Sequence, residues 1–163
     1  MRLIFLSVVM GLALAAAGCG PQTQAPPSSP VLRMALEKGV NADDAIESLK
    51  LRANKLNMKQ VGDLPLSDQV KAMTNKEQRL VRVFLFCDPA TAQKISDANI
   101  EFAAYLPCRI SIAQDKDGKI WLVMLNLQPL IDQIPKDSEL RKEAEKVNES
   151  LIDIMKAGAS GAL

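Results

Sequence analysis

The segment Leu80–Cys87 limits the fold of this chain more than any other, because apolar side chains occupy both alternating faces of it. A strand buried on both faces is typical of the interior of a sheet, and only Arg82 interrupts this run. The following pair Asp88-Pro89 ends the strand and starts a helix, since Asp caps free N–H groups and Pro fits the first helical position. We therefore predict a central strand followed directly by a helix that ends near Asn99.

The rest of the mature sequence alternates strands and helices. Asn41 is a good N-cap for an amphipathic helix, and the Asp-Gly pair at 117–118 supplies the positive backbone angles of a hairpin turn. Pro135 precedes a long helix with an apolar stripe, which starts near Asp137. The expected strands are 32–37, 58–61, 80–87, 108–114 and 119–127, and the expected helices are 41–57, 67–73, 88–99 and 137 onward. This order predicts an α+β fold with helices on one face of a largely antiparallel sheet.

The N-terminus has the pattern of a lipoprotein signal peptide. Arg2 precedes an apolar run over residues 3–17, and small residues then lead directly into Cys19. The run is shorter than the roughly twenty residues of a spanning helix, and small side chains leave the thiol open to processing and acylation. We expect residues 1–18 to be removed and Cys19 to carry palmitate and the membrane anchor. Gly20 follows Cys19 where an Asp would favour inner-membrane retention, so we expect a periplasm-facing protein of the outer membrane.

The linker and the overall charge limit the classes of partner that this chain can bind. Residues 19–30 hold the lipidated cysteine and a linker rich in Pro, Gln and Ser, which predicts a flexible tether, and residues 31–163 are long enough for one domain. Removal of residues 1–18 takes only Arg2 from 20 basic and 19 acidic side chains, leaving a formal net charge of zero. A neutral chain with interspersed charges argues against nucleic-acid binding.

The chain contains no histidine. This excludes Ser-His-Asp and Cys-His nucleophile systems, zinc or haem held by histidine, and imidazole proton transfer. We do not predict an enzyme or a cofactor from this composition.

Three sequence blocks resemble the successive signatures of the "domain of unknown function 302" family. They are Val83–Pro89, Leu106–Ile110 and Asp117–Leu122, and the resemblance covers roughly residues 31–126 and extends into the C-terminal helix. It implies a saddle-shaped α+β fold similar to the TATA-binding-protein class, and it implies no reaction. It also implies homodimers among some relatives and, for relatives with this cysteine pattern, export in bacteria with sulfur or metal redox metabolism.

Cys87 and Cys108 provide the clearest chemistry in the sequence. If their strands pair antiparallel, both thiols lie at the same end of the sheet, and opposed Cα atoms are about 4.5 to 5.5 Å apart. That separation lies within the roughly 4.4 to 6.8 Å that a disulfide accepts. Asp88 and Arg109 adjoin the two cysteines, and Trp121 is either the roof of a pocket or a packed core aromatic. The candidate ligand or redox site therefore comprises Cys87, Asp88, Cys108, Arg109 and Trp121.

Three interpretations of the cysteine pair remain open. The pair is structural, as a disulfide or as two buried thiols. Alternatively it is a redox or sulfur-transfer site, because the helix N-terminus after Cys87 and the neighbouring Arg109 both favour thiolate. A third interpretation is a site for Cu(I) or a sulfur compound, with Met124 as an additional soft ligand to the metal.

Three functions follow from these interpretations. A lipid-anchored protein that binds a small ligand or partner requires a preformed apolar cavity beside the cysteines. A thiol redox or sulfur-carrier protein requires an exposed sulfur and a reversible bridge. A structural subunit that dimerises through its sheet requires a large exposed apolar patch. We favour the first as the prediction from sequence.

Overall fold

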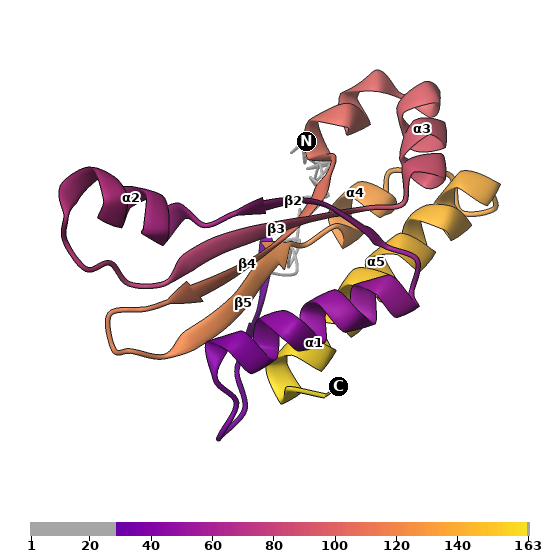
Figure 1. Cartoon of the computed structure of the whole chain (residues 1–163). Coiled ribbons are helices and arrows are strands. Elements are labelled where there is room, and N and C mark those ends of the chain that lie inside the picture. The colour runs from indigo at the N-terminus through magenta and orange to yellow at the C-terminus, as the bar shows by residue number, and fades with distance from the viewer. Residues whose placement is uncertain (1–28, 163) are drawn as a thin grey trace, which may run out of the picture.

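The computed structural model describes residues 29–162, which form one five-stranded antiparallel sheet with helices packed on it (Figure 1). The predicted signal peptide and Cys19 lie outside the described residues. Within residues 29–162, no helix combines the length and the apolarity that crossing a bilayer requires. The elements are β1 (Val31–Ala35), α1 (Ala42–Lys55), β2 (Lys59–Leu64), α2 (Leu66–Thr74), β3 (Val81–Cys87), α3 (Pro89–Ala98), the 3-10 helix η1 (Ile100–Tyr105), β4 (Cys108–Gln114), β5 (Ile120–Leu125), α4 (Gln128–Ile131) and α5 (Glu139–Ser160).

The strand order is β1-β5-β4-β3-β2, and every neighbouring pair is antiparallel. Helices α1 and α5 lie side by side across one face of this sheet (Figure 1). The predicted α+β class, with helices on one face, is therefore confirmed. The strand predicted from Leu80 to Cys87 is interior, as expected, because β4 and β2 flank it.

Strand register divides the side chains between two faces. One face carries the buried side chains of β3, β4 and β5 and packs on α1 and α5. The other face, which we call the open face, has no covering helix layer in the described part of the chain (Figure 1). From the register, its positions are Val31, Arg33, Ala35, Lys59, Gly62, Leu64, Val81, Val83, Leu85, Cys87, Arg109, Ser111, Ala113, Trp121, Val123 and Leu125.

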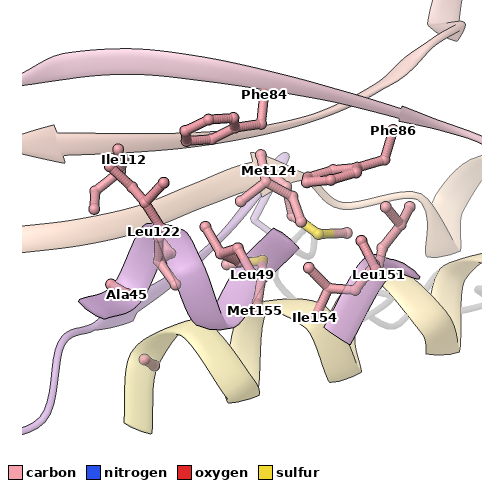
Figure 2. Close-up of a cluster of buried hydrophobic side chains, with 14 of the residues drawn as sticks. Ala45, Leu49, Phe84, Phe86, Ile112, Leu122, Met124, Leu151, Ile154 and Met155 are labelled. Atoms are coloured by element: carbon pink, nitrogen blue, oxygen red, sulfur yellow. The ribbon is translucent and has the colours of Figure 1, made fainter. Parts of the chain in front are cut away.

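The main core lies between the helix-covered face and the two long helices (Figure 2). Phe84 and Phe86 of β3 stack with their ring centroids 6.4 Å apart, and Leu49 of α1 and Ile154 of α5 are fully buried beneath the sheet. Burial of each such side chain stabilises the fold by roughly 1.5 to 3 kcal/mol. The predicted apolar stripe of the C-terminal helix therefore packs on the sheet and on α1.

Capping side chains fix where the helices begin. Asn41 accepts a hydrogen bond from the Asp44 N–H at 2.9 Å and starts α1, as predicted. Ser138 caps α5 through the Arg141 N–H at 3.2 Å, so the helix begins two residues later than the predicted Asp137. Each such cap contributes about 1 kcal/mol, because it satisfies an N–H group that has no partner within the helix.

Helix α5 approaches the sheet closely at Gly158. A Cβ atom at this position would lie 2.7 Å from both Cγ and Cδ2 of Leu49 and 3.0 Å from Cδ1 of Leu122. Leu49 and Leu122 are fully buried and have little room to move. The absence of a side chain at residue 158 is therefore what lets α1, α5 and β5 meet.

We predict that Gly158→Ala lowers the free energy of unfolding by about 1 to 3 kcal/mol, the usual cost of overpacking a core. Helix propensity alone would raise stability by about 1 kcal/mol, so the sign of the change separates the two effects. Urea denaturation followed by circular dichroism measures this change in the free energy of unfolding. Ser160→Ala, at an exposed position of the same helix, is the control and should change stability by less than about 0.5 kcal/mol. A stabilised Gly158→Ala variant would contradict the close approach.

Candidate functional site

An apolar pocket lies at the end of the sheet where β3 finishes and β4 starts. Its cavity volume is ≈ 70 Å³, and ≈ 640 Å³ of empty space lies between its walls when the open mouth is included. The walls come from α3, η1, the segment around α4 and the first half of α5. The lining residues are Cys87, Asp88, Thr91, Ala92, Ile95, Phe102, Tyr105, Leu106, Cys108, Leu127, Leu130, Ile131, Ile134, Ala144 and Val147.

The connection between β3 and β4 forms one side of this pocket. Asp88 caps α3 by accepting hydrogen bonds from the Ala90 N–H at 3.2 Å and the Thr91 hydroxyl at 2.9 Å. Asn99 then ends α3 and caps η1 through the Glu101 N–H at 3.0 Å. These two caps turn the chain beyond the sheet and back again, which places Ile95 and Phe102 against the pocket.

Helices α4 and α5 form the opposite side. Ile131, Ile134 and Ala144 are buried together in a small cluster separate from the main core. Arg141 joins the two helices, because its guanidinium donates to Asp132 at 2.8 Å and to the Ile134 carbonyl at 3.1 Å. The pocket wall is thus held by packing and by a charged anchor outside the cavity.

Cys87 and Cys108 both line the pocket, so the prediction that they meet at one end of the sheet agrees with the structure. The predicted direct opposition is wrong. Cys108 lies opposite Phe86, and Cys87 lies opposite Lys59. A one-residue offset turns neighbouring side chains toward opposite faces of a pleated strand. Both cysteines are free thiols, so the disulfide proposed from the sequence is not present.

The pocket keeps both thiols neutral. Burial, and then the nearby Cys87, raise the pKa of Cys108 to about 11. Burial, and then the carboxylate of Asp88, raise the pKa of Cys87. The sequence suggested the reverse, because helix N-termini favour thiolate. Here Asp88 occupies the helix N-terminus and adds a negative charge beside the sulfur.

The remaining predicted site residues lie elsewhere. Asp88 lines the pocket, whereas Arg109 is exposed on the open face and its guanidinium donates to the Pro107 carbonyl at 3.4 Å. Asp88 and Arg109 are not partners in any ion pair of the described residues. Met124 is buried in the main core and does not line the pocket. Residues 29–162 hold no cluster of three or more Cys, Asp or Glu side chains suited to a metal ion.

Trp121 is neither a core aromatic nor the roof of this pocket. It lies on the open face opposite Ala113, at the other end of β4 from Cys108. Its Nε1–H donates to Asp115 at 2.8 Å, and the cations of Arg33 and Lys119 lie 5.0 and 4.3 Å from the ring centroid. The alternation of side chains along β5 predicts two faces, but it does not indicate which of them the helices cover.

The contribution of the segment around α4 to the apolar lining was not predicted from the sequence. Steps of three and four residues separate Leu127, Leu130, Ile131 and Ile134. This spacing is the pattern of one apolar helix face. That pattern was available in the sequence. It carried no signal for a cavity, because a lining residue and a packed residue have the same hydropathy.

The family profile described as "Domain of unknown function DUF302" matches residues 33–158. The chain belongs to this family. The family match confirms the resemblance seen in the three sequence blocks, and it covers both cysteines and every element from β1 to α5. A crystal structure of an uncharacterized conserved DUF302 protein from Bacillus stearothermophilus is similar, with a TM-score of 0.65 and 14% identity. The similarity covers 80% of this chain and 98% of that one, and at this identity it shows the shared fold alone. No curated protein matches the chain.

The raised pKa of Cys108 predicts an alkaline loss of stability. The folded state holds its thiol proton to a pKa of about 11, whereas an unfolded thiol loses it near 8.5. The free energy of unfolding should therefore keep its full value below about pH 8.5. It should fall as the pH rises toward 11, because the unfolded chain then releases a proton that the folded chain retains. Chemical denaturation at pH 8 and pH 11 measures the loss, which should be about 3 kcal/mol for this group.

Cys108→Ala is the control, because other groups also titrate in this range. The variant should be less stable than the unchanged protein at pH 8, but its decline between pH 8 and pH 11 should be smaller. Equal declines would show that the thiol is not protected by the pocket.

Proposed function

We propose that this protein is a lipid-anchored member of the bacterial cell envelope that binds the apolar part of a small molecule in the pocket beside Cys87 and Cys108. The observation that carries this proposal is the preformed cavity, which is walled by apolar side chains and open to solvent. Binding sites for small molecules are typically concave and apolar with a few polar groups. A cavity of this kind beside the cysteines is what the ligand-binding hypothesis requires.

The size and chemistry of the pocket favour a slender, uncharged group. A cavity of ≈ 70 Å³ has room for a short alkyl chain or a small ring, and the wider mouth leaves space for a polar head. No Lys or Arg is among the lining residues. The Asp88 carboxylate is occupied by the Thr91 hydroxyl and by backbone N–H groups. The charged part of an amphiphilic ligand would therefore remain in solvent.

The state of the thiols argues against a reaction that needs thiolate. At a pKa of about 11, the thiolate fraction of Cys108 at pH 7 is about 1 in 10,000. Attack on a disulfide or binding of a soft metal requires the deprotonated sulfur. Neutral thiols are weakly polar and suit an apolar lining, so we assign Cys87 and Cys108 to ligand contact.

The predicted ligand class can be tested with a series of straight-chain alcohols from butanol to decanol. We expect affinity to rise about fourfold per added CH₂, because each buried CH₂ contributes about 0.8 kcal/mol, and then to stop rising when the cavity is full. Methyl NMR of the full chain in detergent micelles measures binding. Shifts should occur at Ile95, Ile131 and Ile134, whereas Ile154 in the main core should not respond.

A pair of variants in α3 tests whether the cavity is the site. Ala92→Leu fills the pocket from a lining position, and Ala98→Leu makes the same change at an exposed position of the same helix. We expect Ala92→Leu to weaken alcohol binding and to lower the chain length at which affinity stops rising. Ala98→Leu should leave both unchanged. Equal binding by both variants would refute the pocket.

The predicted anchor is tested separately at Cys19. In a Gram-negative host supplied with labelled palmitate, the chain should take up label and be recovered with the membranes. Cys19→Ala should prevent labelling and leave the longer precursor, because acylation and cleavage both depend on that thiol. Mass spectrometry of the recovered chain measures both. Labelling of Cys19→Ala, or an unlabelled chain with residues 1–18 still attached, would contradict the anchor.

A further inference from the structure

The open face is an uncovered, apolar surface in the described part of the chain. It is built from all five strands, and exposed side chains on it include Val31 (38%), Leu64 (43%), Val81 (36%) and Leu125 (44%). Helices α1 and α5 both lie on the other side of the sheet (Figure 1). Several exposed apolar side chains on one uncovered face favour a contact site.

The charges on this face are mostly basic. From the register, the charged side chains at open-face positions are Arg33, Lys59 and Arg109. The carboxylate of Asp115 reaches the edge of this face, where it accepts a hydrogen bond from the Trp121 Nε1–H at 2.8 Å. Lys119 adds a further cation at one end, where its Nζ lies 4.3 Å from the centre of the Trp121 ring. The net charge of the mature chain is zero, so this basic bias is a property of the face and not of the whole protein.

We propose that the open face docks on a membrane surface, with anionic phospholipid headgroups as the binding partner. Arg33 and Arg109 complement the headgroup phosphates, and Trp121 is the residue type that proteins place at the membrane interface. A second copy of the chain fits less well, because no register position of this face within the described residues is acidic and the Asp115 carboxylate at its edge is bonded to Trp121 of its own chain. An uncompensated like charge at such an interface is unfavourable.

Strand β1, which follows the linker, lies at one edge of the sheet. Residue Val31 is itself on the open face, at the edge strand β1. The proposal rests on the proposed function in one respect, which is that the anchor at Cys19 holds the domain near the bilayer. The linker of residues 20–30 can span at most about 40 Å, which keeps the face within reach of the headgroups.

Trp121 is the only tryptophan in the chain, so its fluorescence reports on this face alone. The full chain, purified in detergent, is reconstituted into vesicles of phosphatidylcholine with or without phosphatidylglycerol. With phosphatidylglycerol we expect a blue shift of the Trp121 emission and a loss of intensity when the lipid acyl chains carry bromine. Without it, or at high salt, both effects should shrink, because screening weakens the arginine contacts.

A matched pair of charge variants tests the docking geometry. Arg109→Gln removes a cation from the open face, and Lys146→Gln removes one from an exposed position of α5 on the opposite side. We expect Arg109→Gln to lower the ratio of docked to undocked protein about fivefold. Lys146→Gln should leave it unchanged.

The remaining outcomes overturn the proposal. Bromine quenching that is equal with and without phosphatidylglycerol, or equal for both variants, would exclude this face as the headgroup contact. A Trp121 shift that depends on protein concentration without lipid would identify a second copy as the occupant. Failure here is distinguishable from failure of the proposed function, because the alcohol titration and the palmitate labelling do not involve Trp121 or Arg109.

Discussion

The rest of the structure depends on the packing of two helices against one face of the sheet. Leu49 of α1 meets Gly158 of α5 at a distance that admits no additional side-chain atom, and Leu122 of β5 completes the contact. Because both helices cover the same face, all of the large fully buried side chains lie between them and the sheet. This one-sided core leaves the second face of the sheet free for a different role.

The pocket is a consequence of a long connection between two paired strands. Strands β3 and β4 are antiparallel neighbours, yet α3 and η1 intervene where a short hairpin would suffice. This excursion extends beyond the end of the sheet, and α4 with the first half of α5 covers it from the other side (Figure 1). The cysteines adjoin the cavity because they are the last residue of β3 and the first residue of β4.

The apolar environment of the pocket affects whether the cysteine pair contacts a ligand as neutral thiols or reacts as thiolate. An apolar wall favours a neutral ligand and also a neutral thiol, because burial disfavours charge. Asp88 strengthens this effect at Cys87, since its carboxylate occupies the helix N-terminus that would otherwise stabilise a thiolate. Ligand binding through an apolar contact and catalysis through a thiolate are therefore competing uses of this site, and its geometry favours the first.

Local signals in the sequence predicted most of the fold. Asn41 and Asp88 predicted helix starts, because capping depends on a few neighbouring atoms. The Asp-Gly pair before β5 predicted a hairpin, because the turn also depends on local backbone angles. The sequence did not predict which face of β5 the helices cover, so Trp121 was placed in the core or over the pocket. It also did not predict the one-residue offset of Cys87 and Cys108, because register depends on contacts between distant segments.

The adjacent residues Cys108 and Arg109 connect the two surfaces. Alternation along β4 directs Cys108 toward the pocket and Arg109 toward the open face. A membrane that contacts Arg109 therefore lies one residue away from the wall of the cavity, because Cys108 and Arg109 are consecutive residues whose side chains point to opposite faces of the sheet. A ligand with an apolar chain is enriched in the same bilayer that the basic face would recognise. The two proposals thus describe one arrangement, in which the sheet separates a lipid-facing surface from a protein-lined site for the apolar part of a small molecule.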